Sequence, residues 1–124
     1  MSRLHFPLVA LAVAGALFAA GSTSAASQKK ATKLFGQSGP GYNIKLTTYN
    51  FVPVKRLKPG LYTFTINDRA TNHNFHLVGP GVNKSTPIRF FGTKVWKDVT
   101  LKKGTYKFWC DVHKSTMHGS FKVA

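Results

Sequence analysis

The sequence predicts an all-β protein, with an antiparallel β-sandwich of about seven to eight short strands as its fold class. Short segments rich in aromatic and β-branched residues follow one another, and Gly- and Pro-containing turns separate them. No stretch shows the apolar period of an amphipathic helix. With 124 residues, 43% of them hydrophobic, the chain has the length for one small core. An immunoglobulin-like interaction module would have the same outline, so the fold class leaves the function open.

The predicted strands begin after residue 41. Tyr42, Ile44 and Leu46 alternate with polar neighbours, which is the period of a half-buried strand. The other segments with strand composition are residues 61–66, 74–78, 90–91, 99–101, 105–110 and 120–123. Turns are expected at Pro59-Gly60, at residues 79–81 and at Lys103-Gly104.

The first 41 residues carry no strand pattern and divide into two segments. Residues 1–26 have the features of a secretory signal peptide: Arg3 at the start, an uncharged apolar stretch over residues 7–20, and small residues before cleavage near Ala25 or Ala26. A membrane anchor is the alternative, but the apolar stretch is shorter than the ~20 residues of a membrane span. Residues 27–41 are predicted to be a flexible lead-in, and residues 42–124 to be the folded domain. We therefore expect export, either to the periplasm or out of the cell.

The charge of the chain is strongly one-sided. Lys and Arg number 18 against 3 acidic residues, for a formal net charge of +15. Such a protein favours acidic partners. Export argues against nucleic acid, and the cations form no run longer than a pair. We expect a monomer without a membrane span, whose partner is a protein with an acidic docking surface; a basic surface that serves only solubility is the alternative.

The last twenty residues place a Cys, a His and a Met on one turn between two predicted strands. Cys110 is the only cysteine and cannot form a disulfide within the chain, so in an oxidising compartment it needs either deep burial or a metal. His113 and Met117 follow it on the turn. Two imidazoles and a thiolate with a weak axial thioether are expected of electron-transfer copper. Met117 could instead be an apolar plug at the end of the sandwich.

The second imidazole must come from another part of the chain, where His73 and His76 compete. On a strand that begins at His73, residues 73, 75 and 77 share the inward face, and His76 points outward. This pattern favours His73, although a bulge would reverse the facing.

These motifs resemble the cupredoxin family, in particular its plastocyanin and pseudoazurin branch. His73-Asn74 is similar to the His-Asn pair of the family, and the last loop is similar to its pattern G-T-Y-x-F-aromatic-C-x-x-H followed by Met and Gly. The matching residues are Gly104, Thr105, Tyr106, Phe108, Trp109, Cys110, His113, Met117 and Gly119. The resemblance covers nearly all of the chain after residue 26. It implies a Greek-key sandwich with one type 1, or blue, copper ion held by His73, Cys110, His113 and Met117.

One departure from the pattern concerns spacing. Two residues separate Cys110 from His113, as in plastocyanins, whereas three separate His113 from Met117, as in azurins. The axial interaction of Met117 is therefore the part of the site that the resemblance defines least.

The resemblance also implies roles for residues around the ligands. Asn74 and Asp111 would fasten the His73 loop to the Cys110 loop, unless Asp111 is a plain exposed carboxylate. Trp109 should point away from Cys110, either into a partner-docking area or against a neighbouring strand. His113 resembles the partly exposed imidazole of the family, where electrons would leave.

The function expected from these features is single-electron transfer through Cu(I) and Cu(II) by an exported protein that is not an enzyme. The sequence holds no paired carboxylates for acid and base catalysis and no Ser-His-Asp arrangement. A copper carrier or buffer that delivers the ion to another exported protein would use the same ligands. A metal-free binding module of immunoglobulin type is a third possibility.

Overall fold

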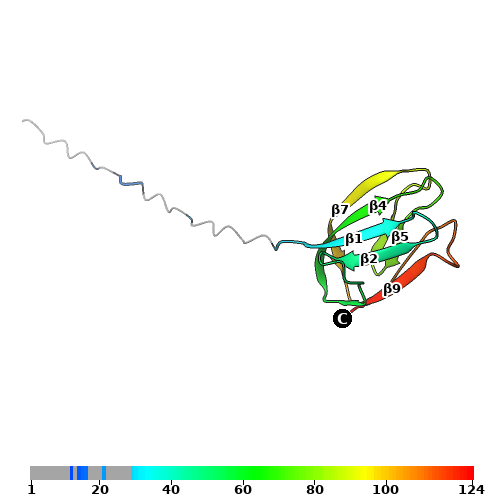
Figure 1. Cartoon of the computed structure of the whole chain (residues 1–124). Coiled ribbons are helices and arrows are strands. Elements are labelled where there is room, and N and C mark those ends of the chain that lie inside the picture. The colour runs from blue at the N-terminus through cyan, green and yellow to red at the C-terminus, as the bar shows by residue number, and fades with distance from the viewer. Residues whose placement is uncertain (1–11, 13, 17–20, 22–28) are drawn as a thin grey trace, which may run out of the picture.

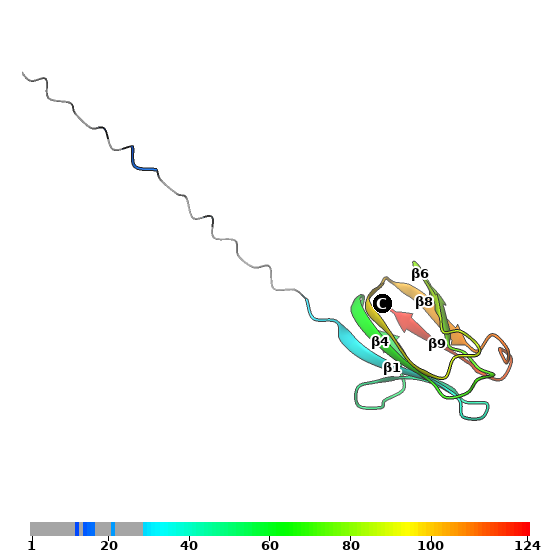
Figure 2. The same ribbon diagram turned by 90° about the horizontal axis from the view of Figure 1, so that it is seen from above.

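The computed structural model describes residues 12, 14–16, 21 and 29–124, and their strands form the two sheets of a β-sandwich (Figure 1). The strands are β1 (Thr32–Ser38), β2 (Ile44–Thr48), β3 (Arg56–Leu57), β4 (Gly60–Asp68), β5 (His76–Gly79), β6 (Val82–Ser85), β7 (Gly92–Leu101), β8 (Gly104–Trp109) and β9 (His118–Val123). One sheet has the order β2-β1-β4-β7 and the other the order β3-β9-β8-β5-β6. Figure 2 shows the two layers from above, with β1 and β4 in one and β8 and β9 in the other.

The prediction of a β-sandwich is confirmed, but the sheets are mixed rather than purely antiparallel. β1 pairs with β4 in parallel, and β3 pairs with β9 in parallel, while the remaining pairs are antiparallel. A parallel pair requires a crossover connection, which here runs from β1 through β2 and β3 before the chain returns as β4. The described part of the chain holds nine strands, more than the seven to eight predicted. The two-residue β3 and the polar β6 lack the composition of a strand, so the sequence pattern did not indicate them.

The prediction of a flexible lead-in over residues 27–41 is wrong for Thr32–Ser38, which form β1. This strand lies between β2 and β4, and Leu34 at its centre is fully buried. Its inward positions are Leu34, Gly36 and Ser38, so the apolar alternation that marks a strand is missing. Gly36 packs tightly there: a Cβ atom would lie 2.5 Å from Ile66 Cδ1 and 3.1 Å from the Phe75 ring, so a larger residue would displace both side chains.

The core holds two stacked pairs of rings, and both pairs involve β8. Tyr106 stacks on Phe121 at 5.2 Å between ring centroids, and Phe108 stacks on Phe75 at 5.4 Å. Gly119 on β9 makes room for Phe108, since a Cβ atom there would lie 2.3 Å from the ring. Close packing on both sides fixes β8 and β9, and therefore the loop that joins them.

The predicted signal peptide, residues 1–26, lies almost wholly outside the described residues, so it stays a prediction. In the part of the chain that the structure describes, no helix has the length and apolar character needed to cross a bilayer.

Replacing Leu34 by Ala tests the position of β1 in the core. We expect the free energy of unfolding to fall by about 2–5 kcal/mol, because the change leaves a cavity between the sheets. The exposed neighbour Lys33→Ala should change it by no more than about 0.5 kcal/mol. Denaturant titrations of the three proteins measure both values, and equal midpoints would contradict a packed β1.

Candidate metal centre

The loop between β8 and β9 is held by its own backbone hydrogen bonds. The His113 amide donates to the Cys110 carbonyl at 3.2 Å, and the Met117 amide donates to the His113 carbonyl at 2.8 Å. The Cys110 amide donates to the Met117 carbonyl at 3.0 Å, which closes the loop. The three predicted ligands of this loop therefore have fixed backbone positions.

His73 lies in the segment that leads into β5, not on the strand itself. β5 begins at His76, three residues later than a strand that starts at His73. The expected burial nevertheless holds, since His73 is 3% exposed and Phe75 is fully buried, while His76 is only half-buried. The Ser38 hydroxyl at the end of β1 donates to the Asn74 carbonyl at 2.9 Å and holds this segment against the other sheet.

Three of the four predicted ligands converge at one end of the sandwich. The Cys110 Sγ atom lies 3.7 Å from His73 Nδ1 and 3.9 Å from His113 Nδ1, and the two nitrogens are 3.0 Å apart. For an ion in a trigonal plane, bonds of about 2.0 Å to nitrogen and about 2.3 Å to sulfur place the two nitrogens about 3.5 Å apart and each nitrogen about 3.7 Å from the sulfur. The sulfur distances match this spacing, and the nitrogens need to separate only slightly.

Met117 is fully buried on the same loop. Its backbone carbonyl is bonded to the Cys110 amide, so the thioether belongs to the segment that carries the thiolate. A buried Met is also what an apolar plug would be, and axial ligation by Met117 stays a prediction.

The expected fastening of the two ligand loops by Asn74 and Asp111 is confirmed. The Asn74 side-chain amide donates to Asp111 Oδ2 at 2.7 Å, and the Asp111 backbone amide donates to Asn74 Oδ1 at 2.8 Å. These two bonds connect the neighbours of His73 and Cys110, which are 37 residues apart in the chain. Outer contacts of this kind fix the orientation of metal ligands.

Asp111 also makes hydrogen bonds to two aromatic side chains on the outer face of the sheet. Its Oδ1 atom accepts a hydrogen bond from Trp109 Nε1 at 2.8 Å and lies 2.8 Å from His76 Nδ1. Partial burial opposes the charged form of Asp111, but the hydrogen bonds from His76, Asn74 and Trp109 outweigh it and lower its pKa. Asp111 is therefore an anchored carboxylate rather than a free one.

His76, the competing ligand candidate, lies outside the group of His73, Cys110 and His113 and makes hydrogen bonds elsewhere. Its second ring nitrogen, Nε2, lies 2.6 Å from Asn83 Oδ1. Burial disfavours its charged form, but the bonds to Asp111 and Asn83 prevail and raise the pKa of His76. Both ring nitrogens of His76 are therefore engaged by Asp111 and Asn83, away from the group formed by His73, Cys110 and His113.

Buried hydrogen bonds through Thr86 connect the His73 segment to the four-stranded sheet. The Thr86 hydroxyl accepts from the Phe75 amide at 2.9 Å and donates to Asp68 Oδ2 at 3.3 Å. Burial raises the pKa of Asp68 above its ordinary value, against the hydrogen bonds from Ala70 and Thr86. These hydrogen bonds connect Phe75, two residues after His73, to Asp68 at the end of β4.

Tyr42 belongs to the site, although its sequence pattern indicated only a strand. Its ring centroid lies 5.0 Å from that of His113 and 5.9 Å from that of His73. The nearby sequence signal is the turn before it, where Gly39 and Gly41 flank a proline.

Copper titrations of two variants test the choice between the histidines. His73→Ala should lose the stoichiometry of one ion per chain, because one of two imidazoles disappears. His76→Ala should keep it, since this ring lies outside the cluster. Isothermal titration calorimetry with Cu(I) measures both, and the reverse pattern would transfer the ligand role to His76.

The comparisons with known proteins concern the fold. No family model and no curated protein sequence matches the chain. Among solved structures, a reduced rusticyanin is similar with 17% identity over 77% of this chain and 81% of that chain, at a TM-score of 0.50. A purple cupredoxin from Nitrosopumilus maritimus has 17% identity over 75% and 99% of the two chains, at a TM-score of 0.42. A reduced amicyanin variant has 19% identity over 76% and 82%, at a TM-score of 0.39.

The described strands, their two-sheet order and the likeness to rusticyanin agree on one architecture. The cluster of His73, Cys110 and His113, at the end of that architecture, fits a single copper ion. This chain therefore has the cupredoxin fold.

Proposed function

We propose that this protein carries single electrons through one copper ion held by His73, Cys110, His113 and Met117. The observation that carries the proposal is the convergence of one thiol sulfur and two imidazole nitrogens within 3.0–3.9 Å of one another. A thiolate and a thioether favour a soft metal, and two imidazoles with a thiolate in a plane suit copper. When bound, copper supplies the one-electron change between Cu(I) and Cu(II).

The chain contributes a site whose geometry resists change. Cys110 is fully buried and His73 nearly so, which keeps water from the sulfur and one imidazole. The bonds between Asn74 and Asp111 hold the two ligand segments together, and the loop bonds hold His113. Fixed ligands suit electron transfer, because little rearrangement accompanies the change in charge.

Electrons would leave where a ligand approaches the surface. His113 is half-buried, whereas Cys110 and Met117 are fully buried, so its imidazole is the ligand nearest to solvent. Trp109 offers a second approach, because it is the covalent neighbour of Cys110 and is half-buried on the outer face of β8.

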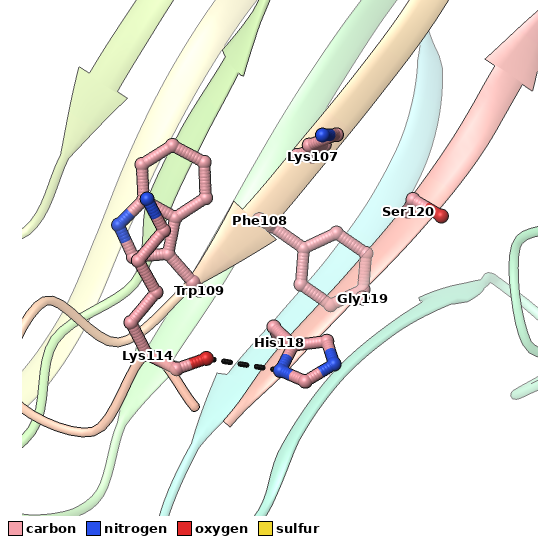
Figure 3. A pocket seen from close by; sticks show the side chains of 7 residues that line it. All are labelled: Lys107, Phe108, Trp109, Lys114, His118, Gly119 and Ser120. Atoms are coloured by element: carbon pink, nitrogen blue, oxygen red, sulfur yellow. Dashed lines mark hydrogen bonds between the residues drawn. The ribbon is translucent and has the colours of Figure 1, made fainter. Parts of the chain in front are cut away.

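We infer a partner with an acidic docking surface from the outer face of the five-stranded sheet. A hollow of about 350 Å³ on this face is lined by Lys107, Phe108, Trp109, Lys114, His118, Gly119 and Ser120 (Figure 3). The Lys114 ammonium lies over the Trp109 ring at 4.3 Å from its centroid, which fixes a cation beside the residue next to Cys110. No acidic side chain lines the hollow, so its charge complements an acidic surface.

The register of the strands extends this basic surface beyond the hollow. Lys122 on β9 pairs with Arg56 on β3, and both are exposed. Lys107 pairs with Ser120 across β8 and β9. Cations on three neighbouring elements therefore face the same side as Trp109.

We also propose that the protein acts as a monomer after export to the periplasm or the cell exterior. The signal-peptide features of residues 1–26 support export. A single cysteine, buried between two imidazoles, suits an oxidising compartment because reagents have no direct access to the thiol.

Replacing Cys110 by Ser tests the copper proposal. The Cu(II)-loaded wild type should show the strong visible band of a Cu(II)–thiolate bond, and the variant should lose it because the sulfur is absent. Circular dichroism should still show a folded sandwich. A band of undiminished intensity in the variant would contradict the assignment of Cys110.

Retention of the ion separates an electron carrier from a copper carrier. Over repeated cycles of chemical oxidation and reduction in the presence of a competing Cu(I) chelator, an electron carrier should keep its copper. Transfer of most of the copper within the first cycles would favour the delivery role.

Electron transfer to an anionic oxidant tests the basic surface. With hexacyanoferrate(III) as the probe, the second-order rate should fall roughly tenfold or more from low to high salt, because mobile ions screen the attraction. Lys107→Glu/Lys114→Glu should lower the low-salt rate more than the matched variant Lys33→Glu/Lys45→Glu, whose exposed lysines lie on the other sheet. Stopped-flow absorbance measures the rates. Equal effects of the two double variants would contradict a role of the hollow in docking. Rates independent of salt would contradict electrostatic attraction of the partner.

A further inference from the structure

We propose that Tyr42 is a positioning residue that holds the imidazoles of His73 and His113 and slows the release of the bound ion. The inference rests on the proposed function for the identity of the ion, and on contacts of the described residues for the role of the ring. It concerns a side chain outside the four proposed ligands and outside the buried core between the sheets.

The loop that carries Tyr42 is built against His73. It joins β1 to β2, and the Gly39 amide donates to the Asn43 carbonyl at 2.7 Å, which closes it. Gly39 is buried with φ +67°, a left-handed conformation that favours glycine, and a Cβ atom there would lie 3.2 Å from His73 Cδ2. Any larger residue at position 39 would press on the imidazole, so the absence of a side chain lets this loop lie directly on the site.

The rings of Tyr42, His73 and His113 form a triangle of edge contacts. Tyr42 meets His113 at 5.0 Å and 79°, and His73 at 5.9 Å and 60°. The two imidazoles meet each other at 4.7 Å and 75°. Edge-to-face geometry of this kind is favourable between aromatic rings. Tyr42 is thus in contact with two ligands that are 40 residues apart in the chain.

The exposure of Tyr42 argues against a role in the core. The residue is 71% exposed, and its ring contacts are with the two imidazoles. A large aromatic left in solvent gains little from burial, so its contribution to the fold is small. The position of the ring beside His73 and His113 is therefore better explained by an effect on these two imidazoles.

The contacts predict an effect on release rather than on binding geometry alone. An imidazole must rotate away from the ion before the ion can leave, and both imidazoles have the Tyr42 ring beside them. Loss of the ring removes two favourable contacts and opens the site to a competing ligand. The phenol oxygen has no hydrogen bond among the described residues, so the ring and not the hydroxyl should carry the effect.

The experiment compares three variants loaded anaerobically with Cu(I) and mixed with excess bicinchoninate, whose coloured complex reports the released ion. Tyr42→Ala should release copper roughly tenfold faster than the wild type, since two ring contacts are lost. Tyr42→Phe should release it within about twofold of the wild-type rate, because the ring remains. Tyr49→Ala is the matched control: this tyrosine is 69% exposed, and its ring pairs with Phe35 at 6.2 Å.

A second measurement uses the unloaded protein. Nuclear Overhauser contacts should connect the Tyr42 ring with both imidazoles, and the imidazole signals should shift in Tyr42→Ala but not in Tyr49→Ala. Thermal unfolding should be nearly unchanged in all three variants, which separates positioning from a structural role.

Release from Tyr42→Ala at the wild-type rate would overturn the proposal, as would equally fast release from Tyr42→Phe. A wild type that binds no copper would instead contradict the proposed function. In that case the nuclear Overhauser contacts of the unloaded protein still test the position of Tyr42. Their absence would overturn the proposal that its ring holds the two imidazoles.

Discussion

The pair of hydrogen bonds between Asn74 and Asp111 is the constraint on which the metal site depends. The ligands come from two segments, one before β5 and one after β8, and the chain between them includes β5, β6, β7 and β8. Each partner contributes one donor and one acceptor, so the two segments are locked in distance and in orientation. Because both residues are covalent neighbours of ligands, these bonds fix the backbone from which the side chains of His73 and Cys110 extend.

Asp111 extends this constraint to the outer face of the five-stranded sheet. The carboxylate that accepts a hydrogen bond from the Asn74 side chain also accepts one from Trp109 Nε1, and it is paired with His76 on β5. The Trp109 ring then lies beside Lys114, which belongs to the ligand loop. A single carboxylate therefore connects the buried ligands, the half-buried indole next to Cys110 and the basic hollow. In a chain with only 3 acidic residues, this carboxylate lies at the surface and still links the two ligand segments to the outer face of the sheet.

The opposite sheet contributes to the site through the end of β1 and the loop that follows it. Ser38 reaches across to the Asn74 carbonyl, and Gly39 lies against His73. The parallel pairing of β1 with β4 brings Ser38 next to Asp68, whose carboxylate supports Thr86 and the Phe75 amide. The His73 segment is thus held from both sheets, which explains why an irregular segment can present an imidazole in a defined direction.

The parts of the site that could be predicted from the sequence are close together in the chain. Cys110, His113 and Met117 lie within eight residues, so one short loop must bring them together in any fold that forms the turn. The composition of the strands likewise identified the β-sandwich, because aromatic and β-branched residues between Gly and Pro turns suit pleated, half-buried segments. The fastening of Asn74 to Asp111 was implied by the family resemblance rather than by spacing.

The features that could not be predicted depend on contacts between segments far apart in the chain. β1 has Leu, Gly and Ser on its inward face, and nothing in that pattern shows that Gly36 packs closely against Ile66 from β4. His73 lies before its strand, so the contacts that direct it come from Ser38 and Asp111 rather than from alternation along β5. Tyr42 has the pattern of a strand residue, yet its ring lies on two imidazoles because a tight glycine turn places it there. Each of these depends on the packing of segments distant in the chain, and periodicity within one segment carries no information about its neighbours.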